Sequence, residues 1–330
     1  MNPASPRLPA CSPARAGLFG LLLLTSAFAG AEDPAERRLQ EARRLLEREG
    51  PEVACERLQA LALKHPGTES AAAALWELFR LHEAAGRPQD AFEALDGLVA
   101  RQPGHFARAH ARQLLLVRRL LAAGERRGSA PEGRGSPNID ADAVVAMLAR
   151  VVLNGPHDET GIQSRYLLGV ALHRAGRADE ARAQFEEFTE LHAGHELADD
   201  AGYQAAAIAY QKWRVMKGGS PRDRERAAVL MSWFLNRFPQ SDKTAQARAC
   251  QAELQLAEQR ELTSLASYYE QRGDLRAAAV YYRQLAVKFP GLAMEGSPLR
   301  ERINTVLAPD ADVLSGSDKV GPRRAEAGEQ

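Results

Sequence analysis

Residues 191–200, LHAGHELADD, include side chains of the types that bind metal ions. His192, His195 and Glu196 lie there beside two aspartates, which is the composition of a metal-ligand cluster. The histidines of an HExxH zinc site stand one turn apart on a helix, but Gly194 interrupts a helix at this point. The segment therefore predicts the end of a helix, and we expect neither a metal nor a cofactor.

A second group of candidate residues is a stripe of arginines in the stretch 106–127. Steps of four, seven and seven residues put the four side chains on one face of a helix. Such a face could hold acidic groups or the terminal carboxylate of a bound chain, although a solvated outer face gives the same pattern. The candidate partner-binding residues are Arg108, Arg112, Arg119 and Arg126.

Motifs for covalent or phosphate chemistry are not found. The Gly-rich segment 124–136 follows a predicted helix and lacks the Gly-Lys-Ser/Thr of a phosphate-binding loop. No Ser or Cys lies in a nucleophile motif. We therefore expect a protein that is not an enzyme, since an enzyme built on a helical array would need converging acids or a metal on its concave face.

Composition indicates a helical protein. The 330 residues include 43 basic and 43 acidic side chains, so no general attraction to nucleic acid is expected. Charged residues make up 26% of the chain and aromatic residues only 6%, a profile more typical of helices than of a β-sandwich. The chain is long enough for one or two cores or for a continuous repeat array.

A repeat runs through the sequence. Apolar segments with helical periodicity end at Pro66, Pro103, Pro156, Ala193, Pro239 and Pro290. A small or compact residue stands twelve positions before each end, at Ala54, Ala91, Val144, Ala181, Ala227 and Ala278. In three copies a glycine precedes that residue by five positions, at Gly86, Gly176 and Gly273. Each copy predicts two antiparallel helices, with glycine in the turn and proline ending the second helix.

The fourth copy carries the most specific spacing. Leu168 and Gly169 precede Ala181 by thirteen and twelve positions, and Phe185 follows it by four. These are the offsets of the tetratricopeptide repeat, or TPR, which the chain resembles. The resemblance implies an all-α, TPR-type α-α solenoid, a right-handed superhelix of about six helical hairpins.

Domain boundaries follow from the repeat. The solenoid is expected over 32–307, with insert loops at 124–139 and 216–223 and a polar, disordered tail at 308–330. A stretch without Gly or Pro from Ser241 to Arg272 predicts a long first helix in the sixth unit. The tryptophans Trp76, Trp213 and Trp233 are expected to pack in the interior.

The N-terminal segment has the pattern of an export signal. Two arginines precede an apolar run over 16–29, and small residues at Ala27, Ala29 and Ala31 suit cleavage, so we assign 1–31 to a signal peptide. The run is about 14 residues, short of the roughly 20 that span a bilayer. We expect an exported, periplasmic protein.

Residues 238–291 resemble the BamD family of outer membrane protein assembly factors in Gram-negative envelopes. The matching positions are Phe238, Pro239, Ser241, Leu256, Ala257, Tyr268, Tyr269, Arg272, Gly273, Ala277, Ala278, Phe289 and Pro290. The segment 196–211 resembles the same family, and the likeness extends over about 35–291. Two features depart from the family: no cysteine for a lipid anchor follows the apolar run, and six units replace the usual five.

The resemblance implies a scaffold on the periplasmic face of the outer membrane, peripheral to it. Such a scaffold would recognise unfolded β-barrel precursors with its N-terminal repeats and bind the barrel-forming assembly subunit with its C-terminal repeats. No individual binding residue of the family maps onto this chain. The alternative function is a periplasmic TPR adaptor of the cell-division or peptidoglycan machinery, and the identity of the partner separates the two.

Overall fold

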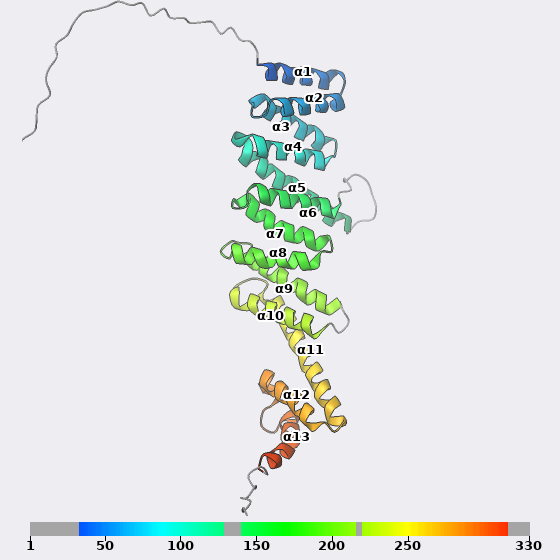
Figure 1. Ribbon diagram of the computed structural model, residues 1–330, viewed down its shortest axis with the longest axis vertical. Coiled ribbons are helices and arrows are strands. Elements are labelled where there is room, and N and C mark those ends of the chain that lie inside the picture. Colours follow the sequence, from blue (N-terminus) through cyan, green and yellow to red (C-terminus); the bar gives the residue numbers. More distant parts are fainter. Residues whose placement is uncertain (1–32, 129–139, 216–219, 316–330) are drawn as a thin grey trace, which may run out of the picture.

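The computed structural model describes residues 33–128, 140–215 and 220–315. Within these ranges the ordered elements are thirteen α-helices and two short 3₁₀ turns, η1 (Pro103–His105) and η2 (Pro290–Leu292). The expected signal segment, 1–31, lies outside the described residues. The helices stack one after another along the long axis of the molecule, from α1 to α13 (Figure 1).

Twelve of the helices form six hairpins, as the repeat predicts. The pairs are α1 (Pro34–Arg48) with α2 (Pro51–Lys64), α3 (Glu69–Ala84) with α4 (Pro88–Arg101), α5 (Phe106–Gly128) with α6 (Ala141–Asn154), α7 (Glu159–Arg174) with α8 (Ala178–Leu191), α9 (Ala198–Val215) with α10 (Pro221–Arg237), and α11 (Thr244–Gln271) with α12 (Leu275–Lys288). A last helix, α13 (Pro298–Ser315), packs on α12. Each helix contacts the next along the chain, which confirms an all-α solenoid of helical hairpins.

The small residues of the repeat are buried on the second helices of the hairpins. The five alanines at this position, from Ala54 to Ala278, have no exposed surface, and Val144 in the third unit is also buried. Because alanine has only a methyl group, the backbones of the two helices can approach closely at these points. The repeat positions are therefore structural.

Three glycines make the turn between the helices of a hairpin. Gly86, Gly176 and Gly273 have φ of 67°, 77° and 79°, a left-handed conformation that favours glycine. The amide after each glycine donates to a carbonyl five residues earlier, for example Arg177 N–H to Leu172 C=O at 2.9 Å. This is the hydrogen bond of a Schellman helix end, so the predicted turns are confirmed.

The second helices end at the predicted positions. Each repeat proline stands two residues after the last residue of α2, α4, α6, α10 or α12, and Ala193 has the same place after α8. Proline cannot donate the amide hydrogen bond that would continue a helix. The end after α8 shows that alanine is compatible with the same turn.

Three expected boundaries differ from the structure. Residues 124–128, expected in a loop, belong to α5, and 221–223 belong to α10. Ser220 caps α10 by accepting from the Asp223 amide at 3.1 Å, and Pro221 suits the first turn, so these residues start a helix. The solenoid boundary expected at 307 falls inside α13, which continues to Ser315. The remaining insert and tail residues lie outside the described ranges.

The buried residues form three clusters along the stack. The first extends from α1 to α9, the second joins α9, α10 and the start of α11, and the third joins the end of α11 to α12 and α13. The 28-residue helix α11, which confirms the predicted long helix, connects the second cluster to the third. Between Leu254 and Leu262 it has no buried residue, so the last cluster is linked to the rest by one helix.

Candidate binding groove

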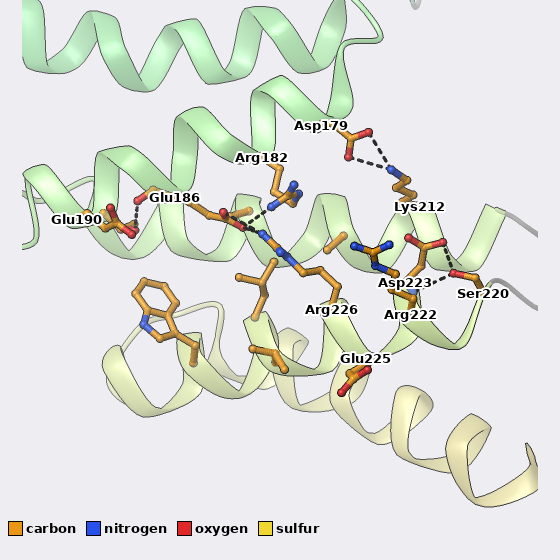
Figure 2. Close-up of a pocket in the computed structure, with 16 residues that line it drawn as sticks. Asp179, Arg182, Glu186, Glu190, Lys212, Ser220, Arg222, Asp223, Glu225 and Arg226 are labelled. Carbon is orange, nitrogen blue, oxygen red and sulfur yellow. Dashed lines mark hydrogen bonds and ion pairs between the residues drawn. The ribbon is translucent and has the colours of Figure 1, made fainter. Parts of the chain in front are cut away.

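A groove of about 980 Å³ lies between α8 and α10, with α9 beneath it. Both walls are second helices of their hairpins, and both pack on α9. Figure 2 shows α8 and α10 running in the same direction, with Asp179 and Asp223 near one end and Glu190 toward the other.

Small residues of α9 create the groove. Ala205 and Ala209 line its floor and are almost completely buried, so their methyl groups leave the space between the walls open. Gly202, one turn earlier on α9, makes room for an aromatic ring. A Cβ atom added there would lie 3.1 Å from Cζ3 of Trp233. The feature of the sequence that indicates the groove is thus the spacing of small residues on α9, at positions 202, 205 and 209.

One end of the groove is polar and balanced in charge. Lys212 Nζ donates to both carboxylate oxygens of Asp179, at 2.9 and 2.8 Å. This hydrogen bond lowers the pKa of Asp179, which remains ionised. Ser220 donates to Asp223 at 2.7 Å, which holds that carboxylate at the start of α10.

The middle of the groove is crossed by an ion-pair cluster. Arg182 on α8 donates to Glu186 at 2.6 Å, and Arg226 on α10 reaches both oxygens of the same carboxylate at 3.3 Å. The dashed lines in Figure 2 converge on Glu186 from both arginines. Two guanidinium groups therefore share one carboxylate, and this cluster of three side chains carries one positive charge in excess.

The other end of the groove has exposed apolar side chains on α10, across from Glu190 on α8. Trp233 is 39% exposed and Val229 is 59% exposed, and both line the groove together with Leu230. The expectation that Trp233 is buried was wrong. Its neighbour Phe234 is the residue that faces the core, with no exposed surface, and one step along a helix turns the next side chain by about 100°.

The arginine stripe on α5 lies against α3. The guanidinium carbon of Arg108 is 4.6 Å from the centroid of the Trp76 ring, and that of Arg112 is 5.2 Å from the centroid of Phe79. Arg119 forms an ion pair with Glu83 on α3 at 2.7 Å, and Arg112 approaches the same carboxylate at 3.4 Å.

These three arginines thus bridge the first helices of neighbouring units. The side chain of Arg126 lies outside the described residues. Since the guanidinium groups already have aromatic and acidic neighbours, their positive charge is partly compensated within the chain. Binding of a partner to this stripe remains a prediction.

The histidines and acids of 191–200 point to different neighbours. His192 packs on Phe188 with ring centroids 5.3 Å apart, whereas His195 Nδ1 accepts from the amide of Leu197 at 3.1 Å. Asp200 in α9 forms an ion pair with Lys243 at 3.2 Å. In the ranges that the structure covers, no group of three His, Cys, Asp or Glu side chains is placed to hold a metal ion.

The fold and the groove define a helical-repeat protein with surfaces suited to binding other proteins. A family model described as "YfiO: Outer membrane lipoprotein" matches residues 141–309, more than half of the chain. The chain therefore belongs to the YfiO family. The match begins at α6, includes the whole groove and ends within α13.

Comparisons with other proteins add little. No curated protein sequence matches the chain significantly. Similar solved structures include a tetratricopeptide repeat protein from Parabacteroides merdae, 12% identical over 83% of this chain and 98% of that one, with a TM-score of 0.30. PilF of Pseudomonas aeruginosa is 16% identical over 83% of this chain and 97% of that one, with a TM-score of 0.29. The fold assignment therefore rests on the helix order and packing of the chain itself.

Among the described helices, none is long and apolar enough to cross a bilayer.

Proposed function

We propose that the chain is a non-enzymatic scaffold, similar to BamD, that assembles β-barrel proteins into the outer membrane from the periplasmic side. The observation that carries the proposal is the family match over 141–309, which contains the BamD-like stretch 238–291. Its partners would be the barrel-forming assembly subunit and unfolded β-barrel precursors. The protein would lie peripheral to the outer membrane.

The surface of the last hairpin supports a docking role. Val280 and Val287 lie seven residues apart on α12, on one face of the helix, and are 49% and 80% exposed. Apolar residues that gather on one exposed helix face form a surface that a partner protein could cover. We therefore expect the contact with the barrel-forming subunit in this C-terminal part, as the resemblance to BamD implies.

Affinity purification from envelopes of the native organism tests the proposal. The tagged chain would be solubilised gently, and the proteins that co-purify would be identified by mass spectrometry. A Val280→Glu, Val287→Glu variant is the matched control, because it places charge on the exposed face of α12 without changing a buried residue.

We expect a large β-barrel assembly subunit with the unmodified chain and much less of it with the variant. Recovery of cell-division or peptidoglycan proteins without that subunit would contradict the proposal and favour the periplasmic adaptor.

A further inference from the structure

We propose that the groove between α8 and α10 binds an α-helical segment of a partner protein. The bound helix would place an apolar side chain against Trp233 and a carboxylate against Arg182 and Arg226. This inference rests on the proposed scaffold function, and it adds the site and the chemistry of one partner.

The walls of the groove favour a helix over an extended chain. All three elements that form the groove are helices, whose interior backbone groups are already hydrogen-bonded. An extended segment would find no strand edge to pair with, whereas a helix satisfies its own backbone.

Trp233 supplies the apolar contact. Tryptophan is among the residues that contribute most to binding at protein interfaces, because it buries a large area with few rotatable bonds. Here its ring packs over Gly202 on one side and remains 39% exposed at the groove, next to the exposed Val229. An apolar side chain of the partner would remove this surface from water.

The arginine cluster supplies the charge. Glu186 neutralises one of the two guanidinium groups that it contacts, so a second carboxylate is needed for balance. The other acids that line the groove do not pair with these two arginines. Asp179 is paired with Lys212, and Figure 2 shows Glu225 pointing away from α8. Asp223 and Glu190 lie toward the two ends of the groove. A carboxylate from the partner helix complements the middle of the groove.

The spacing of the two contacts sets the pattern of the partner. Arg226 and Trp233 are seven residues apart on α10, which is about 10 Å along a helix. A helix that lies along the groove would therefore carry its acid and its apolar anchor about seven residues apart, on one face. Glu190, across the groove from the exposed apolar side chains of α10, would disfavour an acid next to the anchor.

Site-specific photo-crosslinking in cells of the native organism tests this inference. The full chain would carry p-benzoylphenylalanine at Val229, in the groove. Leu153 on α6 is the matched control position, since it is 75% exposed and lies outside the groove. Crosslinked peptides would be mapped by mass spectrometry, first in the unmodified background and then with Arg226→Glu. Arg57→Glu serves as the charge control, on an exposed arginine of α2.

We expect an adduct at Val229 with a helical protein segment that has an acid and an apolar residue about seven positions apart. Arg226→Glu should reduce its yield by about tenfold, the change that corresponds to about 1.4 kcal/mol, whereas Arg57→Glu should not change it. Circular dichroism checks that both variants fold. Replacing the partner's acid with lysine should restore the adduct with Arg226→Glu.

Several results would overturn the inference. These are no adduct at Val229 above that at Leu153, an adduct with lipid or with a second copy of the chain, and a yield that Arg226→Glu leaves unchanged. The experiments distinguish a failure of the groove inference from a failure of the proposed function. If the assembly subunit co-purifies but no helix is captured at Val229, only the groove inference is wrong. If the captured helix belongs to a division protein, only the assembly function is wrong.

Discussion

Substitution of Gly169 tests the packing of the fourth hairpin. In the structure, a Cβ atom added to Gly169 on α7 would lie 2.7 Å from Cε1 and 2.8 Å from Cζ of Phe185 on α8. Phe185 is 1% exposed, and the Tyr166 ring lies 5.5 Å away, so the phenyl ring has no free space to move into. Gly169→Ala should therefore destabilise the protein.

The magnitude follows from two opposing effects. Overpacking of a close-packed core costs about 1–3 kcal/mol, and contacts below 3 Å with a buried ring belong to the upper part of that range. Alanine in place of glycine in a helix contributes up to about 1 kcal/mol in the opposite direction. The net loss in the free energy of unfolding should be about 1–2 kcal/mol.

Gly124→Ala is the matched control. Gly124 is also helical, on α5, but a Cβ atom there would meet nothing within 4 Å. Only the higher helix propensity of alanine remains, so the free energy of unfolding of this variant should rise by about 0.5–1 kcal/mol. Urea unfolding followed by circular dichroism measures both variants. A Gly169→Ala protein as stable as the unmodified chain would refute the reasoning, as would an unchanged penalty in a Phe185→Leu background.

Three further predictions concern titration and local stability. Burial, with repulsion from Arg165, lowers the pKa of His192 below its ordinary 6.5. The contribution of His192 to the free energy of unfolding is therefore complete above pH 6.5 and is lost as the pH falls below that value. His192→Asn should lose less unfolding free energy at mildly acidic pH than the unmodified chain, and an equal loss would count against the assignment. Burial and the hydrogen bond to Glu253 raise the pKa of Tyr210 to about 12, so its contribution is complete below pH 10 and is lost between pH 10 and 12. Tyr210→Phe should therefore unfold with a shallower alkaline pH dependence, and an unchanged slope would show that other groups dominate. Amides of α12 should exchange with deuterium faster than those of α4. The buried cluster that contains α12 is smaller than the one that contains α4, and it is joined to the rest of the protein through α11 alone. Equal protection of the two helices would indicate a single cooperative unit.

Local features of the fold were predictable from the sequence. The hairpin turns and helix ends depend on residues such as Gly176 and Pro239, whose backbone preferences act within a few positions. The start of α10 was missed, although Ser220 and Pro221 form a recognisable helix-capping pair. Their neighbouring glycines made the segment resemble a loop.

The groove depends on contacts between distant residues, and the sequence pattern does not determine these. Trp233 and Phe234 are both apolar and adjacent, so periodicity did not distinguish the buried ring from the exposed one. The arginines of α5 do share a face, but their proximity to Trp76 depends on how α3 and α5 are aligned. The ion pair between Glu186 and Arg226, 40 positions apart, likewise requires the packing of both walls on α9.

Depletion of the protein in its native organism is the most direct test of the central claim, a scaffold role in β-barrel assembly. Folded β-barrel proteins in the outer membrane would be quantified as expression is switched off, with soluble periplasmic proteins as the internal control. The proposal predicts that folded barrels decrease while the soluble proteins keep their levels, and that re-expression restores the barrels. Unchanged barrels together with a defect in division or in the cell wall would contradict it.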